Sequence, residues 1–117
     1  MNNKNYLVIG GSKGIGLETV RQLTQAGANV WVAARHLTDE LADLGVSFQA
    51  IDVTQAFVLN NLPAVLHGVV YCPGSINLKP FNRLSEQDFM NDIQVNVLGA
   101  VRTLQQTFTA LKAAKGS

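Results

Sequence analysis

The chain has 117 residues, of which 47% are hydrophobic and 15% are charged, and its formal net charge is +1. This length and composition fit one globular domain and exclude a disordered chain. The near-neutral charge argues against a nucleic-acid partner, and no apolar run approaches the roughly 18 residues of a membrane span. Cys72 is the only cysteine, which excludes an internal disulfide. The first residues do not resemble a signal peptide, so we expect a cytoplasmic protein.

A short strand followed by a helix is predicted at the start of the chain. Residues 6–9 form an apolar run, and residues 14–26 place apolar side chains near one helix face. These side chains are Ile15, Val20, Leu23 and Ala26. We expect Gly27 to end the helix, because glycine adopts the left-handed conformation that commonly follows a helix without a Cβ penalty.

Two more strands with a short helix between them follow. Residues 30–34 are continuously apolar, as expected for a strand buried on both faces of a sheet. Residues 38–44 predict a short helix, and residues 46–51 predict the third strand. We expect a helical turn within residues 54–62 and a fourth strand over residues 66–72.

The longest predicted element is a helix over residues 85–112. Ser85 and Asp88 have the spacing of a capping box, in which each side chain bonds the backbone N–H of the other residue. Gly99 inside the helix costs about 1 kcal/mol relative to alanine, which indicates close packing there. Apolar residues recur every three or four positions, which is typical of an amphipathic helix. They are Phe89, Ile93, Val97, Val101, Leu104, Phe108 and Leu111.

The alternation of strands and helices indicates an α/β fold. Short loops between such elements are typical of a parallel, right-handed, doubly wound sheet of the Rossmann type. The expected strand order is 3-2-1-4. This order places a ligand crevice at the carboxyl ends of the first and fourth strands.

Four glycines lie within the seven residues that join the first strand to the first helix. Glycine permits positive φ and close approach of another group, and the helix that follows directs N–H groups at a bound anion. The spacing is G-x-x-x-G-x-G rather than the G-x-G-x-x-G of the common dinucleotide fingerprint. It resembles the opening motif of the short-chain dehydrogenase/reductase family, with Ile9 in place of the usual threonine. Cofactor phosphates are expected to bind at Gly10, Ser12, Lys13, Gly14, Ile15 and Gly16.

Arg35 follows the second predicted strand, at a position where an NAD-binding chain usually carries an acidic residue for the ribose 2′-hydroxyl. A guanidinium there can pair with a 2′-phosphate, and Lys13 can supply a second positive charge. Members of the resembled family that prefer NADP carry this pair of basic residues. We therefore expect NADP(H) as the cofactor. The alternative is that both are solvated loop residues.

Two further sites are implied by the resemblance. Asp52 and Val53 follow the third strand, where the Asp-Val pair of the family flanks the adenine; alternatively, Asp52 caps the turn near Thr54. The family usually has Asn-Asn-Ala-Gly after the fourth strand, where this chain reads Tyr71-Cys72-Pro73-Gly74. Only Gly74 matches, and it would let the backbone pass close to the adenine-side ribose.

Asn96 in the long helix matches the catalytic asparagine of the family, which holds a water in the proton relay. The alternative is a polar residue that is hydrogen-bonded locally at the helix surface. The serine and the Tyr-x-x-x-Lys of the family are not found in these residues. We therefore expect residues 1–117 to be the NADP-binding half of one Rossmann-type domain, without strand 5 onward and inactive alone.

The sequence as a whole predicts an NADP(H)-dependent oxidoreductase that transfers hydride between nicotinamide and a carbonyl or alcohol substrate. The resemblance implies a homo-oligomer that pairs through the helix over residues 85–112. Two other interpretations stay open. One is a non-catalytic nucleotide sensor on the same fold, consistent with the altered segment at residues 71–74. The other is an interaction fragment that dimerises through the long helix and the exposed edge of the fourth strand.

Overall fold

Four parallel strands form one sheet in the computed structural model, which describes residues 3–74 and 79–116. The strand order is β3-β2-β1-β4, as the sequence predicted. The strands are β1 (Asn5–Ile9), β2 (Asn29–Ala34), β3 (Ser47–Ala50) and β4 (Gly68–Tyr71). At the carboxyl end of β1, Ile9 pairs with Ala33 of β2 and with Tyr71 of β4. The strand order therefore reverses at β1, which makes this end of the sheet the topological switch point.

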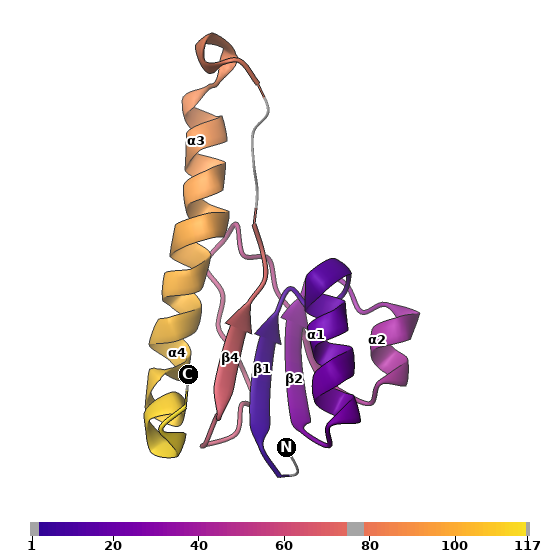
Figure 1. Ribbon diagram of the computed structural model, residues 1–117. Coiled ribbons are helices and arrows are strands. Elements are labelled where there is room, and N and C mark those ends of the chain that lie inside the picture. The colour runs from indigo at the N-terminus through magenta and orange to yellow at the C-terminus, as the bar shows by residue number, and fades with distance from the viewer. Residues whose placement is uncertain (1–2, 75–78, 117) are drawn as a thin grey trace.

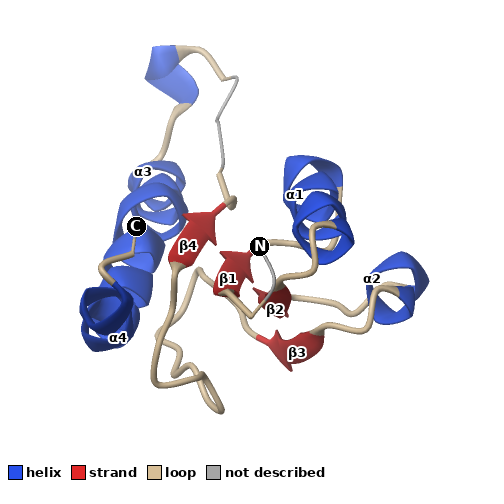
Figure 2. Ribbon diagram, turned by 60° about the horizontal axis from the view of Figure 1, so that its bottom comes forward, coloured by secondary structure: helices blue, strands red, loops and turns tan. Residues whose placement is uncertain are grey.

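Helices cover both faces of the sheet (Figures 1 and 2). The helices α1 (Gly14–Gln25) and α2 (Asp39–Asp43) lie on one side, and α4 (Gly99–Ala114) lies on the other (Figure 2). The buried core on the α1 side consists of Val8, Leu17, Val20, Val30, Val32, Ala34 and Leu41. The core on the α4 side consists of Leu7, Ile9, Ala33, Ile51, Leu66 and Leu111. Successive residues of β1 thus enter opposite cores, as the two-residue period of a strand requires.

The buried face of α1 differs in part from the predicted one. It runs through Gly16, Leu17 and Val20, whereas Ile15 is 83% exposed. Gly16 packs directly on the backbone of Gly10, which turns the side chain of the preceding residue toward solvent. The predicted end of the helix is confirmed, because Gly27 follows the cap with a φ of 86°.

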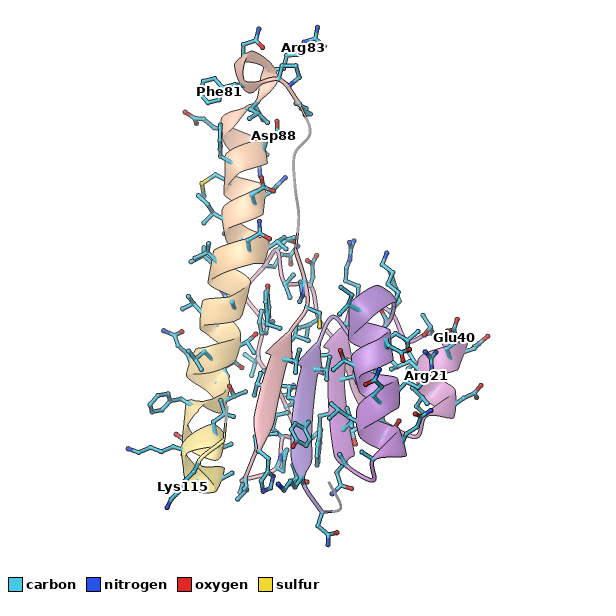
Figure 3. All side chains as sticks on the ribbon, in the orientation of Figure 1. Arg21, Glu40, Phe81, Arg83, Asp88 and Lys115 are labelled. Atoms are coloured by element: carbon cyan, nitrogen blue, oxygen red, sulfur yellow. The ribbon has the colours of Figure 1, made fainter. Side chains whose placement is uncertain are left out.

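An ion pair joins the two helices on this side of the sheet. Arg21 of α1 and Glu40 of α2 point toward one another in Figure 3, with the Arg21 Nη2 atom 3.7 Å from the Glu40 Oε2 atom. Both side chains are substantially exposed, so the pair contributes little to stability. Thr38 caps α2 by accepting a hydrogen bond from the Leu41 N–H at 3.3 Å.

A long helical segment runs without interruption over residues 86–114. A short 3-10 helix, η1 (Phe81–Arg83), precedes α3 (Glu86–Ile93), a π-helical turn η2 (Gln94–Leu98) and α4. The predicted capping box begins α3. The Ser85 hydroxyl accepts from the Asp88 N–H at 3.1 Å, and the Asp88 carboxylate accepts from the Ser85 N–H at 3.0 Å. The end with α3 projects beyond the carboxyl ends of the strands (Figure 1), and the molecule measures 51 × 31 × 19 Å.

The predicted apolar stripe of this helix faces away from the sheet. Its members Phe89, Ile93, Val97, Val101, Leu104 and Phe108 are 43–58% exposed. The seventh predicted member, Leu111, is buried, and the rest of the buried face of α4 consists of Gly99, Thr103 and Thr107. Each threonine hydroxyl donates to the carbonyl four residues earlier, at 2.8 Å for Thr103 and 2.9 Å for Thr107. These local bonds allow polar residues to face the sheet without unsatisfied groups.

The predicted helical turn within residues 54–62 was wrong, because this crossover is irregular and contains no helix. Two glutamine side chains hold it. Gln106 accepts from the Leu59 N–H at 2.7 Å and donates to the Phe57 carbonyl at 2.9 Å. Gln49 binds the neighbouring carbonyl and N–H groups, of Val58 and Asn60, at 2.6 and 2.8 Å. The side-chain amides thus replace the backbone hydrogen bonds that a helix would supply.

None of the helices in the described parts of the chain is long and apolar enough to cross a membrane. Over the same parts, β4 pairs only with β1. The outer edge of β4 is therefore available for pairing.

Candidate cofactor site

The four glycines between β1 and α1 meet different structural requirements. Gly10 and Gly14 have φ values of 80° and 60°, in the left-handed region that favours glycine. A Cβ on Gly11 would lie 2.9 Å from methyl groups of Val20 and Val32, and a Cβ on Gly16 would overlap the Gly10 carbonyl. Gly14 is the exception, because a Cβ there would meet no atom within 4 Å. The turn is thus packed underneath and open at Gly14.

The open side of the turn coincides with the start of α1. Lys13 is the N-cap residue and its side chain makes no capping hydrogen bond, and the first turn of α1 contains no acidic residue. The positive end of the helix dipole is therefore not neutralised by the helix itself. Lys13 and Ile15 are exposed beside it, and Ser12 is half-buried. This arrangement can accept an anion from solvent.

The two predicted basic residues lie on neighbouring loops at this edge. The Thr38 hydroxyl donates to the Ser12 carbonyl at 3.4 Å, which joins the loop after β2 to the glycine turn. Lys13 follows Ser12, and Arg35 begins the loop that contains Thr38; both cations are exposed. Their positive charges therefore occupy the same edge of the sheet.

Asp52 lies at the end of β3, within the influence of Arg35. Its Oδ1 atom accepts from the Thr54 N–H at 2.9 Å and from the Thr54 hydroxyl at 2.6 Å, so the turn-capping alternative is confirmed. The side-chain and backbone hydrogen bonds from Thr54 lower the pKa of Asp52, and the charge of Arg35 lowers it further. The group is therefore a carboxylate at neutral pH. The half-buried Val53 packs against the core on the α4 side.

The end of β4 lies against both the glycine turn and the long helix. The Cys72 N–H donates to the Ile9 carbonyl at 2.9 Å, and a Cβ on Gly10 would lie 3.0 Å from Cδ of Pro73. A Cβ on Gly74 would lie 3.6 Å from the Asn96 Oδ1 atom. The fold therefore brings Gly10, Gly74 and Asn96 to the β1–β4 side of the switch point. Burial raises the pKa of the half-buried Cys72 thiol, which disfavours the thiolate, and the residue packs against the core on the α1 side.

Tyr71 is a feature of this region that the sequence interpretation missed. It ends β4, and its hydroxyl donates to the Val95 carbonyl in the π-helical turn. Gly99 could have indicated this contact from the sequence, because a glycine inside a helix predicts close packing. In the structure, the missing side chain of Gly99 makes room for the Tyr71 ring.

The candidate residues form two groups along one edge of the sheet. Arg35 and Asp52 follow β2 and β3, and Gly74 with Asn96 lies at the end of β4. The glycine turn, which includes Lys13, follows β1 between them. A hollow of about 330 Å³ lies elsewhere, and it is bordered by Trp31, Phe48 and residues 59–62. No candidate residue lines that hollow.

A family model described as short chain dehydrogenase matches residues 4–117. The chain belongs to the short-chain dehydrogenase/reductase family. Enzymes of this family are oxidoreductases that use nicotinamide cofactors.

Among curated proteins, the chain is 29% identical over 127 residues to a PIGF/3-ketodihydrosphingosine reductase fusion protein of Schizosaccharomyces pombe, covering 95% of this chain and 26% of that protein. It is 28% identical over 122 residues to 2,3-dihydro-2,3-dihydroxybenzoate dehydrogenase of Escherichia coli, covering 98% of this chain and 48% of that enzyme. The chain therefore spans half or less of the length of these relatives.

Solved structures of the family share the fold. A short-chain type dehydrogenase/reductase from Mycobacterium ulcerans superposes with a TM-score of 0.80 at 26% identity, over 99% of this chain and 50% of that one. Serine dehydrogenase from Escherichia coli superposes with a TM-score of 0.78 at 21% identity, over 97% of this chain and 58% of that one. The second likeness concerns the fold alone.

Proposed function

We propose that residues 1–117 form the NADP(H)-binding half of an oxidoreductase that acts on a carbonyl or alcohol substrate. One observation carries the proposal. The glycine turn is open to solvent at Gly14, it begins a helix whose N-terminus lacks an internal anion, and Lys13 and Arg35 lie on the joined loops beside it. The negative 2′-phosphate of NADP(H) would complement the positive charges of Lys13 and Arg35 at this edge.

Each candidate residue has a role in this proposal. Gly10 to Gly16 hold the pyrophosphate, with the exposed Ile15 covering part of the cofactor. Lys13 and Arg35 bind the 2′-phosphate through charge-assisted hydrogen bonds. The Asp52 carboxylate accepts from the adenine amine while Val53 packs on the ring, and the lack of a side chain at Gly74 leaves room for the ribose.

The chemical step needs groups beyond this site. The bound nicotinamide supplies or accepts the hydride at its C4 atom. Asn96 holds a water of the proton relay at the carboxyl end of β4. The 117 residues contain no Tyr-x-x-x-Lys, since Gly10 and Ser75 stand four residues after the two tyrosines. We therefore propose that residues outside this segment supply the acid–base step. We also propose that the protein is cytoplasmic.

The exposed stripe of the long helix supports self-association. Val97, Val101, Leu104 and Phe108 present apolar side chains on one face of the long helix, all of them 43–58% exposed. A second copy offers an equal face, as a two-fold symmetric interface requires. We propose a homo-oligomer that pairs through residues 85–112.

Titration of the purified protein with NADPH, followed by nicotinamide fluorescence, tests the binding function. The proposal predicts saturable binding that is at least tenfold tighter than for NADH. Absence of saturable binding would refute it. The second candidate is a nucleotide sensor. It is favoured by the altered segment at residues 71–74, in which the Pro73 ring lies against Gly10 of the glycine turn. A sensor predicts the same binding, but no oxidation of NADPH by any carbonyl compound when the complete protein is assayed.

A further inference from the structure

Tyr71 leaves the sheet at the end of β4 and reaches the long helix. Its hydroxyl donates a hydrogen bond to the backbone carbonyl of Val95. Burial raises the pKa of the phenol, and the nearby charge of Arg102 opposes this effect only in part. The phenol therefore stays protonated at neutral pH and can act as a donor.

The helix is π-helical where Tyr71 contacts it. Between Gln94 and Leu98 the hydrogen-bond spacing widens, and the Gly99 N–H donates to the Gln94 carbonyl five residues earlier. Such turns align backbone groups less well than an α-helix and are frequent at functional sites. The phenol supplies the Val95 carbonyl with a donor from outside the helix.

Gly99 provides the space that this contact needs. A Cβ at Gly99 would collide with the Tyr71 hydroxyl and would lie 3.1 Å from its Cζ atom. Gly99 is buried and Tyr71 is half-buried, so a side chain at Gly99 would displace the phenol from the turn. Tyr71 and Gly99 therefore act as a matched pair, one filling the gap that the other leaves.

Asn96 lies inside the turn that this pair holds. It follows Val95 directly, and its Oδ1 atom lies close to Gly74, three residues after Tyr71. Arg102 fixes the same turn from the other side. Its guanidinium donates to the Gln94 Oε1 atom at 3.0 Å and to the Gln55 carbonyl at 3.3 Å. The turn is thus attached both to β4 and to the crossover that follows Asp52.

We propose that Tyr71 is a positioning residue for Asn96. Its hydrogen bond to Val95 holds the π-helical turn at the carboxyl end of β4, which fixes where the Asn96 side chain lies. The inference rests on the proposed function, since Asn96 acts in the relay only if a nicotinamide cofactor binds at this edge. Because Tyr71 reaches Asn96 through the backbone of the turn, it needs no contact with the cofactor.

Nuclear magnetic resonance of the 15N-labelled protein tests the inference. Tyr71→Phe removes only the hydroxyl, and Gly99→Ala displaces the ring while keeping the hydroxyl. Tyr6→Phe, at the other tyrosine of the chain, is the matched control. The side-chain amide signals of Asn96 are identified by their loss in Asn96→Ala. Each variant is also titrated with NADPH, and its fold is checked by circular dichroism.

We expect Tyr71→Phe to shift the Asn96 side-chain signals and to speed amide exchange across residues 94–99 at least tenfold. Gly99→Ala should show the same two changes, whereas Tyr6→Phe should show neither. The dissociation constant for NADPH should change less than twofold in Tyr71→Phe. Unchanged Asn96 signals and exchange in a folded Tyr71→Phe would overturn the positioning role. Failure of the unaltered protein to bind NADPH would instead overturn the proposed function, because the Asn96 signals are read without cofactor.

Discussion

The hydroxyl of Thr38 donates a hydrogen bond to the carbonyl of Ser12 across 3.4 Å. This contact joins the loop after β2 to the glycine turn, and it places the exposed Arg35 and Lys13 on neighbouring segments. In the described residues, neither Lys13 nor Arg35 forms one of the ion pairs, and Arg35 acts only through its charge on Asp52. The proposed 2′-phosphate site follows from this arrangement.

Gly14 and Gly45 offer a matched comparison of backbone strain. Both have positive φ, 60° and 70°, and a Cβ at either would meet no atom within 4 Å. Alanine at either position should therefore cost about 1 kcal/mol of unfolding free energy from φ strain alone. Only Gly14→Ala should weaken NADPH binding, by at least tenfold, because only Gly14 faces the proposed phosphate. Equal NADPH affinities for the two variants would show that the cofactor does not approach Gly14.

Gln106 should stabilise the crossover between β3 and β4. Gln106→Ala removes two hydrogen bonds to the extended segment, at Phe57 and Leu59, and leaves those backbone groups to water. We expect a loss of about 1 kcal/mol in the unfolding free energy measured with urea. The neighbouring Gln105 is also exposed, and Gln105→Ala should change the unfolding free energy by less than half of that amount. A similar loss in both variants would contradict the role given to Gln106.

The capping box of α3 should make the stability of this helix depend on pH. Hydrogen bonds from the Ser85 backbone and from Lys79 lower the pKa of Asp88 below its ordinary value. The stabilisation by Asp88 is therefore complete above the unfolded pKa, about 3.9, and is lost as the pH falls through the lower folded value. Helicity measured by circular dichroism should fall in this acid range. Asp88→Asn should abolish the dependence, and Glu86→Gln in the same helical turn should retain it.

Ser85→Ala tests the other half of the capping box at neutral pH. Loss of the hydroxyl that accepts from the Asp88 N–H should cost about 1 kcal/mol of unfolding free energy. Ser85→Asp should recover most of this loss, because aspartate is an equally good N-cap residue. No change in urea unfolding for Ser85→Ala would mean that the end of α3 frays in solution.

Leu104 belongs to the exposed apolar stripe and is 54% exposed. Leu104→Glu should convert the proposed oligomer to a monomer in sedimentation velocity, since pairing would bury the new charge without a partner. Gln105→Glu adds the same charge one residue away and should leave the oligomer intact. If the unaltered protein sediments as a monomer at all concentrations, the proposed pairing through residues 85–112 is incorrect.

Much of the fold was predictable because it is specified locally. The two-residue and 3.6-residue periods identified the strands and helices, and the glycine spacing identified the family now confirmed over residues 4–117. The capping box was predictable because Ser85 and Asp88 need only each other. The order 3-2-1-4 followed from the general rules for parallel sheets.

The errors arose at side-chain contacts that hydrophobic periodicity does not encode. The crossover at residues 54–62 is irregular because side chains outside it, Gln49 at the end of β3 and Gln106 in α4, supply its hydrogen bonds. The apolar stripe of the long helix faces solvent because Thr103 and Thr107 occupy the buried face. Their hydroxyls can be buried there because they donate hydrogen bonds to carbonyls of the same helix. Periodicity alone cannot choose between an apolar face and a face of small residues. The π-helical turn depends likewise on Tyr71 from another element.

The most direct test of the central claim is the cofactor preference of Arg35→Ala. Arg83→Ala is the control, because Arg83 is an exposed arginine on η1, at the far end of the long helix (Figure 3). NADPH and NADH are each titrated against the unaltered protein and both variants. We predict that Arg35→Ala weakens NADPH binding at least tenfold and changes NADH binding less than twofold, while Arg83→Ala changes neither. An unchanged ratio of the two affinities in Arg35→Ala would contradict the proposed 2′-phosphate site.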